Sequence, residues 1–316
     1  MASSSFLQLL FAFSIAFAFF SSINAADPKP PVLIPIRKDA AILQYYTTYN
    51  LGSPSYKLNA VIDIGGPFLW FNCNDSRIKS SSNHAVACDT NECSDAGGGI
   101  SCLGCNDTPR LGCANNTWGL FTYNPINDSL ASGGLWKDGI AFGTKSLKMP
   151  HLFFGCGLAG QLNSLATGAQ GMLGLGRTPL SLQTQISSAF NVPPRFALCA
   201  PSSAKPGRLG AIVFGGGPYY MTPYPKDISE VLISTPLILN TVSSAPISRE
   251  GETSSEFFIS ANSINIDGKV VSFNSSLLSF HKDGVGGTTI STVTPYTVLI
   301  AFRYLQSSRE EVCEEC

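Results

Sequence analysis

The sequence predicts an all-β protein, and three observations support this. Short runs of β-branched and aromatic residues recur along the chain, separated by Gly, Pro and Asn, as in proteins built from many hairpins. Gly (30) and Pro (20) together supply about one residue in six of the 316. Helical periodicity is scarce. The expected strands are 44–50, 56–62, 119–123, 139–142, 152–154, 211–214, 256–259 and 263–266.

One helix and one linker are expected among these strands. The helix covers 180–190, and Thr178-Pro179 supplies its start. The residues expected to share one face of it are Leu182, Ile186, Ala189 and Phe190. The polar, turn-rich stretch 200–207 is the predicted linker, since a chain of this length agrees with roughly two domains.

The start of the chain has the features of a secretory signal peptide. An apolar run at 6–20, interrupted only by Gln8 and Ser14, is shorter than the roughly 20 residues that span a bilayer. Small and polar residues and then Ala25-Ala26 follow it. We therefore expect a cleaved signal over 1–25 and no membrane association after cleavage, with an uncleaved anchor as the alternative.

Composition excludes several classes of partner and cofactor. The 20 basic and 21 acidic residues give a net charge of −1, so no positive field for nucleic acid exists. Gly174 and Gly176 suggest a dinucleotide loop, but Pro179 stands where the third glycine is needed. We expect no cofactor.

The ten cysteines fit an oxidising compartment, and six of them lie within 41 residues. The six are Cys73, Cys88, Cys93, Cys102, Cys105 and Cys113. Such a cluster predicts three local disulfides, although fifteen pairings are possible. Zinc is the alternative, but the Cys102–Cys105 pair has its only CxxC counterpart at Cys313–Cys316, too far along the chain for a zinc ribbon. We expect no metal site.

Five Asn-x-Ser/Thr tripeptides offer sites for N-linked glycans if the chain is exported. They begin at Asn74, Asn106, Asn115, Asn127 and Asn274.

An internal repeat relates two strand–turn segments, 61–68 (VIDIGGPF) and 289–296 (TISTVTPY). At a constant offset of 228, the paired positions are Ile62 with Ile290, Asp63 with Ser291, Pro67 with Pro295 and Phe68 with Tyr296. Coincidence between two similar strand–turn segments is the alternative.

An aspartic protease takes one carboxylate from each of two such turns, and the pair, about 3 Å apart, shares one proton. Segment 61–66 resembles the first of these turns, and Tyr123 resembles the tyrosine of the flap. Further landmarks of the family follow in order at 134–138, 154–157, 171–182 and 211–216. The chain thus resembles a plant-type pepsin-like protein, which implies a bilobal pepsin-like aspartic protease fold.

Segment 290–299 (ISTVTPYTVL) sharpens the resemblance. It is similar to the plant family of xylanase inhibitors, extracellular dermal glycoprotein and basic seed globulin, in which serine replaces the second catalytic aspartate. Members are mostly non-proteolytic proteins of the cell wall, and some inhibit microbial xylanases or xyloglucan-specific glucanases. The resemblance implies a protein secreted to the apoplast or wall, with microbial glycoside hydrolases as partners.

The chemistry of the second turn agrees with a non-proteolytic protein. Ser291 has no group that ionises near physiological pH, so a shared-proton pair with Asp63 cannot form. Ile64 occupies the place of a bracing hydroxyl, and Val293 the place of a glycine. Asp63 is therefore predicted to be a structural relic that accepts turn N–H bonds. The alternatives are an aspartic endopeptidase using Asp63 and Tyr123, and a wall globulin with a storage or signalling role.

The resemblance stops after Leu299, and the chain ends in a charged segment, in which five of the last eight residues are charged. We therefore expect an incomplete second lobe and weak or no inhibition by this form. The resemblance places partners of Cys156 and Cys199 in the missing part, and Cys313 and Cys316 could substitute for them. The predicted organisation is a signal peptide (1–25), an N-terminal lobe (26–199), a linker (200–207), a partial C-terminal lobe (208–299) and a divergent tail (300–316).

Overall fold

The computed structural model describes residues 32–96, 99–143, 147–221, 224–248, 251–271 and 275–298. The predicted signal peptide and tail, with Cys313, Cys316 and Asn274, lie outside these residues. The described part is mostly β-strand, which confirms the predicted class. Within it, no helix is long and apolar enough to cross a membrane.

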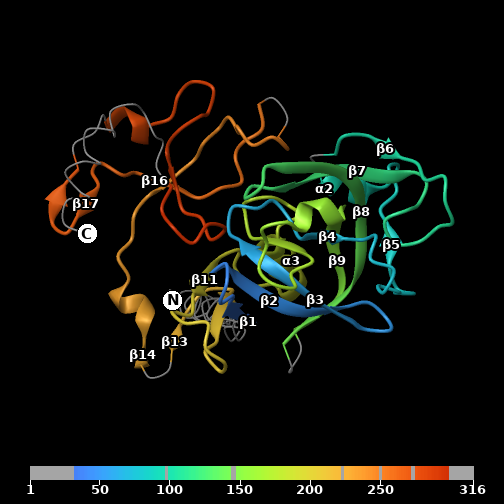
Figure 1. Cartoon of the computed structure of the whole chain (residues 1–316), viewed down its shortest axis with the longest axis horizontal. Coiled ribbons are helices and arrows are strands. Elements are labelled where there is room, and N and C mark those ends of the chain that lie inside the picture. Colours follow the sequence, from blue (N-terminus) through green and yellow to red (C-terminus); the bar gives the residue numbers. More distant parts are fainter. Residues whose placement is uncertain are drawn as a thin grey trace, which may run out of the picture. The chain divides into compact units, whose positions relative to one another are not determined.

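Most strands join one sheet of 12 strands (Figure 1). Its order is β11-β12-β1-β2-β3-β10-β4-β9-β8-β7-β6, and β5 pairs with β8. The bounds are β1 (Val32–Lys38), β2 (Tyr45–Leu51), β3 (Tyr56–Asp63), β4 (Trp70–Asn72), β5 (His84–Ala85), β6 (Cys102–Leu103), β7 (Thr117–Asn124), β8 (Ser129–Phe142), β9 (Leu147–Gly157), β10 (Gly171–Gly174), β11 (Phe196–Cys199) and β12 (Gly210–Phe214).

Short elements complete the described chain. Three small sheets pair β13 (Tyr220–Met221) with β14 (Tyr224–Asp227), β16 (Phe258–Ile259) with β15 (Leu237–Ile238) and β19 (Thr288–Thr289), and β17 (Asn265–Ile266) with β18 (Lys269–Val270). The helices are α2 (Asn91–Ala96), α3 (Leu182–Phe190), and the 3₁₀ turns η1 (Ala159–Leu162), η2 (Ile228–Val231) and η3 (Ser275–Leu278). Each of the eight predicted strands overlaps an observed one, although 256–259 and 263–266 shrink to two residues each.

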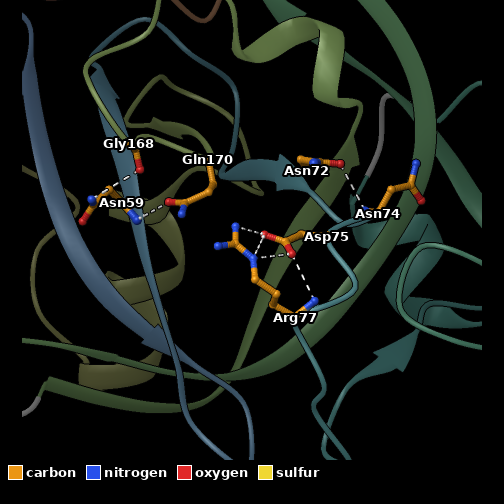
Figure 2. Close-up of polar contacts among 7 residues, drawn as sticks. All are labelled: Asn59, Asn72, Asn74, Asp75, Arg77, Gly168 and Gln170. Carbon is orange, nitrogen blue, oxygen red and sulfur yellow. Dashed lines mark hydrogen bonds and ion pairs between the residues drawn. The ribbon is translucent and has the colours of Figure 1, made fainter.

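Strand β10 runs between β3, to which it is parallel, and β4, to which it is antiparallel. Gln170, just before β10, joins all three strands, and Figure 2 shows its bond to Asn59 of β3. Its side-chain oxygen accepts a hydrogen bond from the Asn59 N–H (2.9 Å), its own N–H donates to the Asn59 carbonyl, and its carbonyl accepts from Asn72. Figure 2 also shows Arg77 paired with Asp75 in the loop after β4.

The core is built from the apolar faces of the central strands. The rings of Phe71 and Phe154 lie 4.7 Å apart between adjacent strands β4 and β9, and both are fully buried. A second cluster contains Val61, Trp70 and Val293. Burial of each such side chain stabilises the fold by roughly 1.5–3 kcal/mol. Because Val293 is buried in the same cluster as Val61 of β3 and Trp70 of β4, the segment around 293 packs against the main sheet.

Helix α3 differs in detail from the prediction. Its N-cap is Ser181, whose hydroxyl accepts from the Thr184 N–H, and it ends at Asn191 in the left-handed conformation. Thr178 is not the start, because its hydroxyl donates to the Pro67 carbonyl instead. Leu182 and Ile186 are buried and Phe190 packs against the core, but Ala189 is exposed.

The stretch 200–207 is the loop of a hairpin. It connects β11 to β12, which pair with each other, and β12 also pairs with β1. Polar turn-forming residues suit a hairpin loop as well as a linker, so composition could not distinguish the two. The lobe boundaries at 26–199 and 208–299 stay a prediction.

Among the described residues there are three disulfides: Cys73–Cys156, Cys88–Cys102 and Cys105–Cys113. The prediction of three local bridges within the cluster was wrong for Cys73, which pairs with Cys156, 83 residues away, because β4 and β9 are neighbours. The expectation that the partner of Cys156 lies in the missing part was wrong for the same reason. Cys93 is buried and Cys199 half-buried, and neither forms a bridge within the described ranges.

The described glycosylation tripeptides differ in accessibility. Asn74, Asn106 and Asn115 are exposed. Asn127 is half-buried, and its side-chain nitrogen donates to the carbonyl of Asn163 (3.0 Å). Attachment of a glycan needs that nitrogen free, so Asn127 is the least suitable of the four.

Candidate functional site

Asp63 ends β3 and begins a tight turn. The Gly65 N–H donates to the Asp63 carboxylate (3.0 Å), and the Gly66 N–H donates to the Asp63 carbonyl (3.2 Å). A Cβ atom at position 66 would lie 2.7 Å from the carboxylate oxygen Oδ2. Glycine at 66 therefore lets the turn fold back onto its own carboxylate.

The end of β10 closes over this turn. Leu175 N–H donates to the Asp63 carbonyl (2.9 Å) and Gly176 N–H to the Gly66 carbonyl (2.8 Å). A Cβ at Gly174 would lie 2.5 Å from the Gly66 carbonyl oxygen. The glycines that suggested a dinucleotide loop are thus needed for close packing around Asp63.

The two halves of the internal repeat meet at this point. The Thr292 hydroxyl donates to the Ile62 carbonyl (2.6 Å) and accepts from the Ile64 N–H (3.2 Å). Residues 64 and 292 are separated by 228, the offset of the repeat. The reciprocal bond is missing because Ile64 is a buried hydrocarbon. One hydroxyl therefore joins the two turns.

We predict that Thr292→Val lowers the free energy of unfolding by about 1–3 kcal/mol, because both of these hydrogen bonds are lost while the shape is kept. Thr297→Val, at an exposed position, is the control and should change stability by less than about 0.5 kcal/mol. Urea unfolding measures both. Equal stability of the two variants would show that the bridge between the turns contributes nothing.

Ser291 does not take the place of a second carboxylate in this structure. It is exposed, and its hydroxyl oxygen accepts from the Val293 N–H of its own turn (3.2 Å). Val293 is buried, and its carbonyl accepts from the Gln44 side chain (3.2 Å). Thr292, rather than Ser291, binds the second turn to the first, and Val293 binds it to Gln44.

Asp63 lines a small pocket of about 30 Å³, whose walls are mostly apolar. The lining includes Phe68, Trp70, Phe121, Tyr123, Met172 and Ile247. Such a volume holds one or two water molecules and no peptide side chain. Ser291 and Glu256 are not among the residues that line it.

Tyr123, the flap-like residue, is held within its own hairpin. Its hydroxyl donates to the Asp128 carboxylate (2.8 Å). Burial, the bond to Asp128 and the nearby negative charges together raise the pKa of Tyr123 to about 12. The buried side chain of Gln161 also stabilises the hairpin of β7 and β8, because it makes hydrogen bonds to Thr122 and Ser129.

Glu256 is a site residue that sequence reasoning missed. Segment 254–256 lies against the Asp63 turn: the Ser255 hydroxyl donates to the Gly65 carbonyl (2.7 Å), and Arg177 donates to the carbonyls of Ser254 (2.7 Å) and Glu256 (3.0 Å). The only sequence signal was a charged residue directly before the apolar run 257–259.

The electrostatics of Asp63 follow from these neighbours. Burial is the main cause that raises its pKa to about 6, and the negative charge of Glu256 adds to the rise, while the N–H groups of Gly65 and Gly66 oppose it. Burial likewise raises the pKa of Glu256, and the Ser254 hydroxyl lowers it.

Comparison with known families decides the classification. Residues 45–216 match the family described as xylanase inhibitor N-terminal, and residues 256–310 match xylanase inhibitor C-terminal. The chain belongs to the xylanase-inhibitor family. This confirms the resemblance stated from the motifs, and the fold is that of pepsin-like aspartic proteases. The expectation that the resemblance stops after Leu299 was wrong, because the second match continues to residue 310.

Relatives of this xylanase-inhibitor family member carry several names. A probable aspartic proteinase GIP2 of Nicotiana benthamiana is 39% identical over 95% of this chain and 70% of its own length. Gamma conglutin 1 of Prunus dulcis is 34% identical over 85% of this chain and 59% of its own length. The crystal structure of edgp superposes with a TM-score of 0.81 at 38% identity, over 90% of this chain and 69% of that one. The chain thus spans 59–70% of these proteins.

Proposed function

We propose that this protein is a secreted, non-catalytic pepsin-like protein that binds and inhibits microbial cell-wall glycosidases, either a xylanase or a xyloglucan endoglucanase. The observation that supports this most is the second turn: in the sequence, Ser291 stands where the resemblance expects the second catalytic aspartate, and in the structure its hydroxyl is bonded within its own turn. Without a carboxyl group there, nothing opposite Asp63 can protonate a leaving amine.

Two further observations weigh against proteolysis. The pocket beside Asp63, about 30 Å³, is too small for the side chain of a peptide substrate. The flap-like hairpin is held in place by two hydrogen bonds: one from Tyr123 to Asp128 within the hairpin, and one from the Gln161 side chain to the Thr122 carbonyl. Glu256, the other nearby carboxyl group, is not among the pocket-lining residues.

The partner class and the location come from the family and the cysteines. The family description names xylanase inhibition, which makes glycoside hydrolases the protein partners to test. Three disulfides suit an oxidising, extracellular compartment such as the apoplast or cell wall. The asparagines of three glycosylation tripeptides are exposed, which agrees with export.

An inhibition titration against one fungal xylanase and one xyloglucan endoglucanase tests the proposal. It compares the 316-residue chain with a version continued past Leu299 by the sequence of the Nicotiana relative. We expect the continued version to inhibit one enzyme with a Kd below about 1 µM, a value within reach of a standard interface. The 316-residue chain should inhibit at least about tenfold more weakly, since loops that must be ordered on binding lose affinity.

Parallel protease assays on denatured protein at pH 3–6 separate the alternatives. We expect no cleavage, and none after Ser291→Asp, because Val293 still stands in place of the turn glycine. Pepstatin-sensitive cleavage that disappears in Asp63→Asn would instead establish an aspartic endopeptidase. If neither version inhibits or cleaves, the proposal is wrong and the alternative of a globulin with a storage or signalling role becomes the better explanation; one relative is named basic 7S globulin.

A further inference from the structure

A second pocket, larger than the one beside Asp63, lies in the last third of the chain. It has a volume of about 420 Å³, against about 30 Å³ for the pocket at Asp63. Two segments form most of this β16–η3 pocket: residues 259–262, at the end of β16 and beyond, and residues 278–280, at the end of η3. Its volume falls within the roughly 300–1,000 Å³ of sites that bind small molecules.

Three neutral polar residues line the β16–η3 pocket. They are Ser260, Asn262 and Ser279, and all three are exposed. Within the described ranges, no hydrogen bond to another part of the chain uses any of these side chains. Two hydroxyls and one amide supply both donors and acceptors, so a ligand with hydroxyl groups of its own can pair with them in either direction.

Apolar side chains form the rest of the lining, among them Ile238, Leu278 and Phe280, each of which is half-buried. The ring of Phe280 is fixed by two neighbours. The buried ring of Phe258 meets it in an edge-to-face arrangement, with 4.9 Å between the centroids. Gly287 approaches it so closely that a Cβ atom there would lie 2.5 Å from its Cε1 atom. The pocket therefore offers a fixed apolar wall beside its hydroxyl and amide groups.

The β16–η3 pocket has no charged group of its own. Its lining, taken over the described part of the chain, contains no Asp, Glu, Lys, Arg or His. A phosphate or carboxylate would lose hydration there without gaining a cation. A purely apolar ligand would cover the three polar groups without pairing them, which also costs free energy. A ligand that suits this lining is neutral, carries several hydroxyl groups and presents an apolar face.

We propose that the β16–η3 pocket binds a neutral oligosaccharide. A sugar ring carries C–H groups on its faces, which would pack against Phe280, and hydroxyls around its rim, which would pair with Ser260, Asn262 and Ser279. Xylose-based and glucose-based chains share this chemistry, so the experiment includes both. Such binding is independent of the glycosidase inhibition proposed above, because it involves the sugar chain itself.

An amide NMR titration of the 316-residue chain with xylohexaose and with cellohexaose tests the proposal without any glycosidase. We expect at least one of them to bind with a Kd of about 1 mM or tighter, and to shift the amides of 259–262 and 278–280. Hexagalacturonate, which is anionic, and hexanol, which has a single hydroxyl, should each bind at least about tenfold more weakly. No saturable binding of either sugar up to about 10 mM, or shifts confined to other residues, would overturn the proposal.

Two variants assign the contacts. Phe280→Leu keeps an apolar side chain but removes the ring, and should weaken binding at least about tenfold. Asn262→Ala removes one polar group at an exposed position and should weaken binding at least about threefold, a result that remains available if Phe280→Leu fails to fold. Asn265→Ala, at an exposed position of β17 outside the pocket, is the matched control and should leave the Kd unchanged.

Thermal unfolding checks that each variant is folded before it is titrated. Binding by Asn262→Ala and a folded Phe280→Leu as tight as that of the natural chain would refute the pocket as the sugar site. Hexanol that binds as tightly as the sugars would show that the pocket is only an apolar cavity, which also contradicts the proposal.

Discussion

Gly171→Ala is expected to prevent the main sheet from forming, or to lower the free energy of unfolding by about 4 kcal/mol or more. A Cβ at this position would lie 1.9 Å from the Trp70 carbonyl oxygen and 2.6 Å from Cα of Phe71. These are backbone atoms of β4, which is itself paired with β9. No side-chain rotation relieves the clash, so β10 must leave its place between β3 and β4.

The control for this variant is Gly160→Ala in η1, because a Cβ there meets nothing within 4 Å. It should change stability by less than about 0.5 kcal/mol. Urea unfolding followed by tryptophan fluorescence compares the two, since Trp70 lies at the affected strand. A Gly171→Ala protein as stable as the control would mean that the register of β10 between β3 and β4 is wrong.

The sequence was most informative where the pattern is local. Strands such as β3 and β7 carry alternating or β-branched runs. The offset of 228 indicated that two turns are related, and Ile64 and Thr292, one pair at that offset, are in contact, whereas Ser291 is bonded within its own turn. Strand β10 was missed as a strand because Gly171–Gly174 has little intrinsic β-propensity, and only its fit between two neighbours makes it extended.

Features fixed by distant packing could not be predicted from single residues. The partner of Cys73 depends on β4 lying beside β9, which no spacing reveals. Glu256 belongs to no motif, and its place near Asp63 arises only when Arg177 and Gly65 bind the segment before β16. The same limit applies to the flap-like hairpin. Its hydrogen bonds to Gln161 could not be predicted, because Gln161 lies about thirty residues further along the chain.

Gln161→Leu is expected to release that hairpin and to destabilise the fold by about 3–5 kcal/mol, because several buried polar groups lose their partners at once. The side-chain oxygen of Gln161 accepts from the Thr122 hydroxyl (2.8 Å) and the Leu158 N–H (3.0 Å). Its nitrogen donates to the carbonyls of Thr122 (2.9 Å) and Ser129 (3.2 Å). The amide thus uses its full hydrogen-bonding capacity to join β7 and β8 to η1.

Gln185→Leu is the matched control. That glutamine also bonds through both ends of its amide, but to Phe153 of β9 and to the Leu180 carbonyl, away from the hairpin. Hydrogen exchange of the amides at 122–130 should accelerate at least about tenfold in Gln161→Leu and stay unchanged in Gln185→Leu. Since the hairpin contributes Phe121 and Tyr123 to the lining of the pocket, its release should also let a hydrophobic dye bind there. Hairpin amides that stay protected in Gln161→Leu would show that Tyr123 and Asp128 hold the hairpin unaided, and that the small volume beside Asp63 does not depend on Gln161.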